Sequence, residues 1–332
     1  MIVDAHNDLL VELWLRRHEP NPFGRHLLEP LRAGGVGVQV CALSAEDAVL
    51  PGAAGDQLLH QAAAFHKACR ANREHVQPVR TAADLESALA SGRIGLILAL
   101  EGVDGLGRNA AAAEVLVEAG VRMVGLTWNH RNAAADGCSE PPHGGVSVFG
   151  RELTERLVAL GVIMDVAHAN ARTFDDVLEL TSARGGQVLC SHTGCAALNP
   201  IPRNLTDSQL RALRAVDGVV GIAAVPMILG SADRSAHRMA EHICHAIDVA
   251  GVEHVGIGAD FMARSAEVVS PPKYLTERLP PGVDMFAGLD GLEGPQHFPA
   301  LAEALQRRGL SDAEIDAVLS GNMLRLLRKA LP

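Results

Sequence analysis

Short runs of aliphatic and β-branched residues recur along the chain, each bounded by small or polar residues. Eight of these runs are apolar on both faces, a pattern typical of strands buried in a parallel sheet. They span residues 1–6, 35–44, 94–102, 121–129, 161–169, 187–193, 218–226 and 253–261. The pattern therefore predicts eight parallel strands.

Between these runs, apolar residues return every three to four positions, which predicts amphipathic helices. Such stretches cover 8–18, 55–74, 149–161, 205–216 and 311–331. Thr206 or Asp207 is an N-cap candidate, and Ser311 with Glu314 has the spacing of a capping box. Strands that alternate with helices in this way favour one (β/α)8 TIM-type barrel domain over residues 1–332.

A doubly wound open sheet is the main alternative to the closed barrel. That fold carries a G-x-G-x-x-G turn after its first strand, and no such turn follows residues 1–6. Two long loops rich in glycine and proline, 130–148 and 262–296, follow the predicted fourth and eighth strands. In a barrel both loops would lie on the face where active sites are built.

The composition narrows the classes of partner and compartment. The net charge is -10 and no run of lysine and arginine occurs, which argues against nucleic acid as a partner. No apolar run is long enough to span a bilayer, and the N-terminus lacks the pattern of a secretory signal. The six cysteines form no C-x-x-C pair and lie mostly among apolar residues, as reduced thiols do. We therefore expect a cytoplasmic protein that does not bind a membrane.

Side chains that bind metals stand at the ends of five predicted strands. They are His6, Asp8, Glu101, His168, His192 and Asp260. Because the carboxyl ends of barrel strands meet at one mouth, three imidazoles and three carboxylates would converge there. Neutral imidazoles cannot compensate clustered carboxylates, whereas one or two divalent cations would. The sequence thus predicts a metal site at the C-terminal ends of the strands.

Each of these residues taken alone has a simpler interpretation. His168 could be a structural residue with a hydrogen bond, Asp260 a helix cap, and Glu101 an ion-pair partner. Their joint placement at strand ends favours the metal site. Arg203 lies in the loop after the sixth strand, beside this site, where an arginine could clamp a substrate carboxylate.

Other histidines and cysteines are predicted to have packing or surface roles. His242 and His245 are about one turn apart on a predicted helix that precedes the last strand, away from the mouth. Cys190 and Cys195 flank His192 without a pattern that would activate a thiolate. These residues are not candidates for chemistry.

The motifs of the chain resemble the membrane (renal-type) dipeptidases, peptidase family M19 of the amidohydrolase superfamily. The matching stretches run in family order from near residue 1 to residue 329. They are "DAHNDLL", "LALEG", "GLTWNHRN", "GVSVFGRELTERLVALGVIMDVAHAN", "SHTGCAALNPIPRNLTD", "HVGIGADF" and "GNMLRLLR". The resemblance implies a site with two zinc ions. His6 and Asp8 would hold the first zinc, Glu101 would bridge both, and His168 with His192 would hold the second.

The resemblance also implies how a substrate is handled. Asp260 would be the acid/base residue, and Arg203 would bind the carboxylate of the substrate. Renal-type members carry a substrate-contacting histidine directly after "LT", where this chain has Trp128. His130, two residues further on, or Asn129 would take that role here.

The resemblance implies a zinc-dependent dipeptidase that hydrolyses the peptide bond of a dipeptide with a hydroxide bridging the metals. It also implies tolerance of a C-terminal D-residue, and it suggests a homodimer. Two alternatives stay open: a metal-dependent hydrolase of another small amide, such as an N-acyl amino acid or a lactam, and a barrel that binds small ligands without catalysis. The last requires lost metal ligands, and all expected ligands are present. Manganese or iron would also suit the nitrogen and oxygen ligands.

Overall fold

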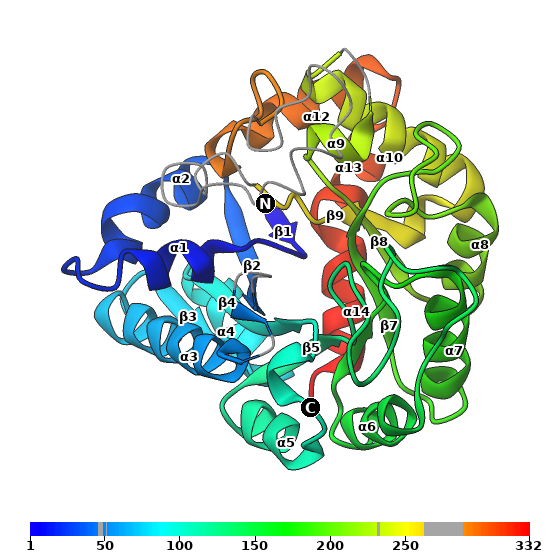
Figure 1. The fold of residues 1–332 in the computed structure, drawn as a ribbon. Helices are drawn as coiled ribbons and strands as arrows, with labels where there is room; N and C mark the ends of the chain where they lie inside the picture. Colours follow the sequence, from blue (N-terminus) through cyan, green and yellow to red (C-terminus); the bar gives the residue numbers. More distant parts are fainter. Residues whose placement is uncertain (46–48, 51, 231–232, 262–287) are drawn as a thin grey trace.

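The computed structural model describes residues 1–45, 49–50, 52–230, 233–261 and 288–332. In this part of the chain, nine parallel strands form one sheet (Figure 1). They are β1 (Ile2–Asp4), β2 (Val36–Ser44), β3 (Val76–Pro78), β4 (Ile94–Glu101), β5 (Val121–Gly125), β6 (Ile163–Asp165), β7 (Val188–Thr193), β8 (Val219–Ile222) and β9 (Val255–Ile257). Each of the eight predicted strands is present, and most are shorter than their apolar runs.

Eight of the strands close into a barrel. The order around the sheet is β2-β1-β9-β8-β7-β6-β5-β4, and pairing of β2 with β4 completes the ring. The predicted barrel is therefore confirmed, and the open-sheet alternative is wrong. The unpredicted strand β3 lies outside this ring. It pairs with the first residues of β4, from Ile94, whereas β5 pairs with β4 from Leu98 onward.

Helices surround the barrel as an outer ring, and the last of them lies across one end of the barrel (Figure 1). They are α1 (Leu9–Leu15), α2 (Leu28–Ala33), α3 (Ala54–Ala71), α4 (Ala82–Ser91), α5 (Ala110–Glu118), α6 (Val148–Ala159), α7 (Ala171–Ser182), α8 (Asp207–Ala215), α9 (Pro226–Leu229), α10 (Ala236–Ala250), α12 (Phe298–Arg307), α13 (Asp312–Asp316) and α14 (Asn322–Ala330). Thr206 is the N-cap of α8, and Ser311 with Glu314 forms the predicted capping box at α13. The stretch 311–331 is not one helix, because a π-helical turn at Ala317–Gly321 separates α13 from α14.

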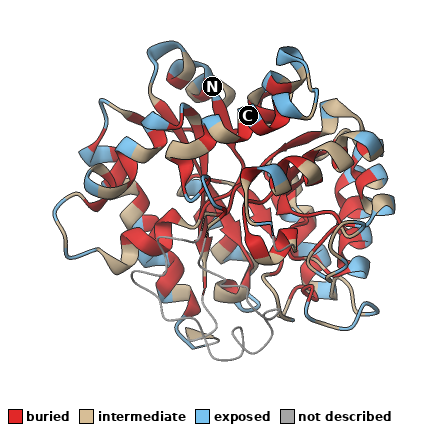
Figure 2. Cartoon of the chain, turned by 90° about the horizontal axis from the view of Figure 1, so that it is seen from above, coloured by how far each residue is buried: buried red, intermediate tan, exposed pale blue. Residues whose placement is uncertain are grey.

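Apolar side chains fill both the inside and the outside of the barrel wall. Along β2, for example, Val38 and Val40 belong to one buried cluster and Cys41 and Leu43 to the other, as the two-residue period of a strand requires. Figure 2 shows the buried residues concentrated in the strands and on the inner faces of the helices.

Helix α14 closes the amino end of the barrel. Its apolar residues join the interior cluster, and the amide of Asn322 donates to the carbonyl oxygens of Val252 and Val255, where β9 begins. The carboxyl end of the barrel is therefore the end at which a site can form. The loop 130–148 connects β5 with α6 at this end, whereas residues 262–287 of the other predicted loop lie outside the described residues. Among the described residues, no helix combines the length and apolarity needed to cross a membrane.

Candidate metal centre

The strand ends of the barrel bring the predicted metal-binding side chains together. Glu101 is the last residue of β4, His192 lies in β7, and His6 and His168 follow β1 and β6 by two and three residues. One oxygen of Glu101, Oε1, lies 3.0 Å from Nε2 of His168, 3.3 Å from Nε2 of His192 and 3.5 Å from Nε2 of His6. A single carboxylate therefore faces three imidazoles.

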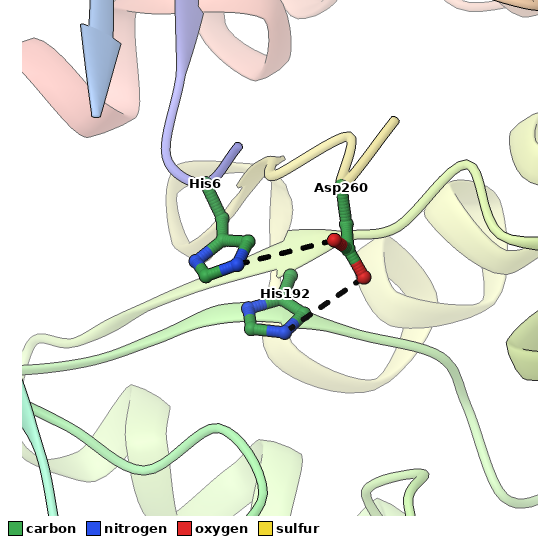
Figure 3. A group of neighbouring side chains, drawn as sticks. All are labelled: His6, His192 and Asp260. Carbon is green, nitrogen blue, oxygen red and sulfur yellow. Dashed lines mark ion pairs between the residues drawn. The ribbon is translucent and has the colours of Figure 1, made fainter. Parts of the chain in front are cut away.

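Three overlapping groups of donor atoms lie close enough to hold a cation, with all atoms of a group within 4.8 Å of one another. The groups are His6–Asp8–Glu101, Glu101–His168–His192 and His6–His192–Asp260. Figure 3 shows the third group, with Asp260 reaching toward both rings; its oxygens lie 3.9 Å from His6 Nε2 and 4.0 Å from His192 Nε2. Glu101 is shared by the first two groups, which is the arrangement expected of a carboxylate between two metals.

The orientation of His168 exposes a lone pair to this cluster. Nδ1 of His168 lies 2.9 Å from the amide oxygen of Asn129, which can only accept, so Nδ1 carries the hydrogen. Nε2 is then a lone pair, 3.0 Å from the Glu101 carboxylate and 2.9 Å from Nε2 of His192. Burial, together with the nearby charges of Arg203 and His6, holds the pKa of His168 well below its usual value, so the ring is neutral. The lone pair of its Nε2 is therefore available to a divalent cation.

Two buried polar atoms at the mouth of the barrel make no hydrogen bond within the described part of the chain. Nε2 of His6 and Oδ1 of Asp8 have no hydrogen-bond partner among the described residues, although they lie 3.6 Å apart. A buried polar atom without a partner is costly. Both atoms belong to the same donor group, so a cation bound there would satisfy both at once. The residues present therefore fit a metal site.

Three ionisable groups of the cluster, His6, Glu101 and Asp260, have raised pKa values. Burial lowers the pKa of His6, but the carboxylates of Glu101, Asp8 and Asp260 outweigh it and raise that pKa to about 10. Burial raises the pKa of Glu101 to about 8 and that of Asp260 to about 6. Divalent cations would replace these protons, since they supply the missing positive charge.

Arg203 lies beside the cluster, as predicted. Its Nη2 donates to the carbonyl oxygen of His192 at 3.0 Å, and Thr193 Oγ1 donates to the carbonyl oxygen of Arg203 at 3.1 Å. The positive charge of Arg203 is one of the influences that lower the pKa of Glu101 and Asp260. The remaining donors of its guanidinium are not used in these contacts.

Trp128, Asn129 and His130, which follow the "LT" motif, have different neighbours. Asn129 Oδ1 accepts from His168, and the thiol of Cys138 also donates to it at 3.3 Å. The Trp128 ring lies 6.1 Å from the His168 ring, between centroids. Among the described residues, His130 joins none of the three donor groups; its Nδ1 lies 4.0 Å from Oε1 of Glu140. The substrate-binding roles of Asn129 and His130 stay predictions.

The histidines and cysteines that were predicted to have packing or surface roles make contacts away from the donor groups. His242 is buried, accepts from the backbone N–H of Cys195 at 2.9 Å and donates to the carbonyl oxygen of Leu229 at 3.0 Å. His245 pairs with Asp207 at 2.8 Å. All six cysteines are free, within a structure that describes each of them. Burial raises the pKa of Cys190 and Cys195, so both thiols stay protonated and unreactive.

The site also contains polar residues that the sequence pattern did not single out. Asp4 and Asp165 end the strands β1 and β6, and Ser191 Oγ lies 2.8 Å from Nδ1 of His192. The two aspartates share a sequence feature, because "IVD" and "IMD" each end a buried strand two or three residues before a histidine.

A closed parallel barrel with three imidazoles and three carboxylates at its carboxyl end is typical of metal-dependent hydrolases of the amidohydrolase-like class. Comparison with known families is more specific. The model of the membrane dipeptidase family, peptidase family M19, matches residues 1–279. The chain therefore belongs to this family, and it is a metallo-dipeptidase by class.

Individual relatives agree with this assignment. Dipeptidase aclJ of Aspergillus oryzae is 28% identical over 351 residues, covering 98% of this chain and 77% of that protein. Dipeptidase verJ of Clonostachys rogersoniana is 30% identical over 250 residues, covering 75% of this chain and 58% of that protein. Among solved structures, a metallo peptidase from Rhodobacter sphaeroides, liganded with a phosphinate mimic of the dipeptide L-Ala-D-Ala, has the same fold. Its TM-score is 0.82, with 24% identity and 99% of each chain covered.

Proposed function

We propose that this dipeptidase works with two zinc ions, one held by His6, Asp8 and Glu101 and the other by Glu101, His168 and His192. The observation that carries the proposal is the position of Glu101, whose carboxylate belongs to both donor groups. Nitrogen and oxygen donors of this kind suit zinc. When bound, such cations polarise a carbonyl group and lower the pKa of water to roughly 7.

Asp260 is proposed as the acid/base residue of the reaction. Its Oδ1 lies 3.9 Å from Nε2 of His6, and its Oδ2 lies 4.0 Å from Nε2 of His192. Asp260 therefore borders the space between the two proposed metal positions. A carboxylate at this position, bordering the space where a water would attack, can serve as a proton acceptor and donor. Asp260 would take a proton from the attacking water and deliver it to the departing amine.

Arg203 is proposed to bind the free carboxylate at the C-terminus of the dipeptide. A guanidinium can bind a carboxylate through two parallel hydrogen bonds. In this structure, Nη2 of Arg203 donates to the carbonyl oxygen of His192. That contact fixes the arginine close to the metal-binding histidine. Because the carboxylate is then held a short distance from the cluster, the peptide bond that is cleaved is the one next to the C-terminal residue. The substrate would therefore need a free C-terminal carboxylate, and His130 or Asn129 would complete the contacts.

The substrate is proposed to be a dipeptide with two free ends, including dipeptides with a D-residue at the C-terminal side. The ligand of the Rhodobacter sphaeroides structure, a mimic of L-Ala-D-Ala, makes this dipeptide the first to test. The alternative is hydrolysis of another small amide, such as an N-acyl amino acid or a lactam. The donor groups would serve either reaction, and Arg203 would bind the free carboxylate of a dipeptide or of an N-acyl amino acid alike, so the choice between these two depends on what contacts the amino end of the substrate.

A substrate panel tests the proposal. Purified full-length enzyme, reconstituted with zinc, is assayed for amine release from L-Ala-L-Ala, L-Ala-D-Ala, N-acetyl-alanine and a lactam. We expect turnover of the dipeptides with kcat/KM far above that of N-acetyl-alanine. Preference for N-acetyl-alanine or the lactam would contradict the dipeptide proposal, and zinc-independent turnover would contradict the metal site.

Three further features are proposed for the whole chain. We propose that residues 1–332 form a single catalytic domain that assembles as a homodimer, which light scattering of the purified protein would test. We also propose the cytoplasm as its compartment, since six free cysteines are typical of a reducing environment. Cell fractionation tests this, and recovery of the protein outside the cytoplasm would contradict it.

A further inference from the structure

Two buried strands of the barrel end in the same way. β1 ends at Asp4 with "IVD", and β6 ends at Asp165 with "IMD". These strands stand on opposite sides of the ring, four places apart in either direction. Among the described residues, neither aspartate belongs to a donor group of the metal centre. Both nevertheless contact the backbone that carries the donor residues.

The carboxylate of Asp4 connects β1 to β9 and β2. Its Oδ1 accepts from the backbone N–H of Ala259 at 2.7 Å and, more weakly, from that of His6 at 3.4 Å. Its Oδ2 accepts from the side-chain amide of Gln39 at 3.0 Å. Asp4 is fully buried, so these hydrogen bonds do not compete with water.

The carboxylate of Asp165 connects β6 to β7 in a similar way. Its Oδ1 accepts from the backbone N–H of Ala167 at 2.9 Å and from that of Ser191 at 2.9 Å. Each aspartate therefore uses one oxygen for two backbone amides. In both cases one amide lies two residues further along its own segment. The other lies on the neighbouring strand β7 (Ser191) or two residues after the neighbouring strand β9 (Ala259).

The amides held by the two carboxylates sit directly before residues of the site. Ala259 precedes Asp260, Ala167 precedes His168, and Ser191 precedes His192, while the remaining amide is that of His6 itself. Hydrogen bonds to an ionised carboxylate are about twice as strong as neutral ones. The two aspartates thus fix the backbone at four of the six residues that face the cluster.

The backbone at two of these residues needs such support. Asp260 has φ 53° and His168 has φ 61°, and they are two of the four non-glycine residues with positive φ in the described part of the chain. The left-handed region is unfavourable for residues with a Cβ, and it persists only where surrounding contacts impose it. In each case the carboxylate holds the N–H of the preceding residue, just where the chain leaves the regular strand and enters this conformation.

We propose that Asp4 and Asp165 are positioning residues that shape the metal centre before a cation binds. Asp4 sets the backbone of His6 and Asp260, and Asp165 sets that of His168 and His192. Other contacts orient the rings: Asn129 binds Nδ1 of His168, and Ser191 Oγ lies against Nδ1 of His192. The inference rests on the proposed ligand set, and it adds that the two carboxylates determine how tightly that set binds metal.

Substitution of each aspartate by alanine and by asparagine tests the inference through zinc affinity, measured by competition with a chromogenic chelator. Residues that support metal ligands typically change metal affinity 10- to 100-fold, so we expect Asp4→Ala and Asp165→Ala to bind zinc 10 to 100 times more weakly. The asparagine variants keep one accepting oxygen and should lie between wild type and alanine. The control is Asp217→Ala, because Asp217 also has positive φ, at 59°, but pairs with Arg325 and Lys329 near the amino end of β8. It should lower the melting temperature and leave zinc affinity unchanged.

Hydrogen exchange on the metal-free wild type needs no variant and covers the case in which an alanine variant fails to fold. The amides of Ala259, Ala167 and Ser191 should be protected before zinc is added. Free exchange of these amides until zinc binds would overturn the inference, as would alanine variants that lose melting temperature yet bind zinc like wild type. If the wild type itself bound no zinc, the proposed metal site would be wrong instead, so the two failures are distinguishable.

Discussion

Replacing Glu101 by glutamine removes the carboxylate on which both proposed metal positions depend. Glutamine has nearly the same shape, so the packing of β4 should survive while one negative charge disappears. The Glu101 side chain is 8% exposed, and its Oε1 lies between 3.0 and 3.5 Å from three imidazole nitrogens. A cation shared among these atoms would lose an electrostatic partner that water does not replace.

The size of this loss can be worked from the geometry. Two unit charges about 4 Å apart interact by about 4 kcal/mol at an effective dielectric constant of about 20, and removing one partner of a buried pair costs about 3–5 kcal/mol. Since about 1.4 kcal/mol corresponds to a tenfold change, zinc affinity should fall by on the order of 1,000-fold for each position that Glu101 serves.

The assay is zinc per chain after dialysis, measured by mass spectrometry, together with a chelator competition. We expect two zinc ions in the wild type and no more than one in Glu101→Gln, with a matching loss of dipeptide hydrolysis. Glu152→Gln on α6 is the matched control, because that side chain is 58% exposed and pairs with Arg156 at the surface. Two zinc ions held at wild-type affinity by Glu101→Gln would refute the shared-carboxylate reasoning.

Three other perturbations have defined outcomes. In metal-free protein, the folded state holds protons on His6 (pKa about 10 against 6.5) and Glu101 (pKa about 8 against 4.5) that the unfolded chain releases at lower pH. Stability should therefore fall as pH rises, between 4.5 and about 8 through Glu101 and between 6.5 and about 10 through His6. A melting temperature that increases with pH from 6.5 to about 8, measured in the presence of a chelator, would contradict this. Arg203→Ala should raise KM for a dipeptide more than it lowers kcat, and steady-state kinetics showing equal loss in kcat and kcat/KM would count against ground-state binding. Leu43→Ala, in the fully buried wall of β2, should cost about 2–5 kcal/mol in urea unfolding. Leu59→Ala on α3, where the side chain is 59% exposed, should change stability by less than about 0.5 kcal/mol.

The barrel was predictable because strands buried on both faces are apolar throughout and therefore stand out in the sequence. β3 was missed, since three residues such as "VQP" leave too short a signal. The break between α13 and α14 was also missed, because a π-helical turn preserves the apolar face on either side. The strand β3 is defined by its pairing with β4, which a local pattern does not reveal.

The candidate metal ligands were predictable because polar residues at the ends of apolar strands are conspicuous. The supporting residues were not, because Asp4 and Asp165 look like ordinary polar strand ends until their hydrogen-bond partners are known. The positive φ of His168 and Asp260 had no signal either, since neither residue is the glycine that usually marks this conformation. Sequence pattern thus indicated which residues could bind a metal but not what holds them in place.

The most direct test of the metal centre is a crystal structure of the zinc-loaded enzyme with diffraction data collected at the zinc absorption edge. The account predicts two anomalous peaks on either side of the Glu101 carboxylate, one beside His6 and Asp8 and the other beside His168 and His192. A single peak, or two peaks of which only one touches Glu101, would contradict it.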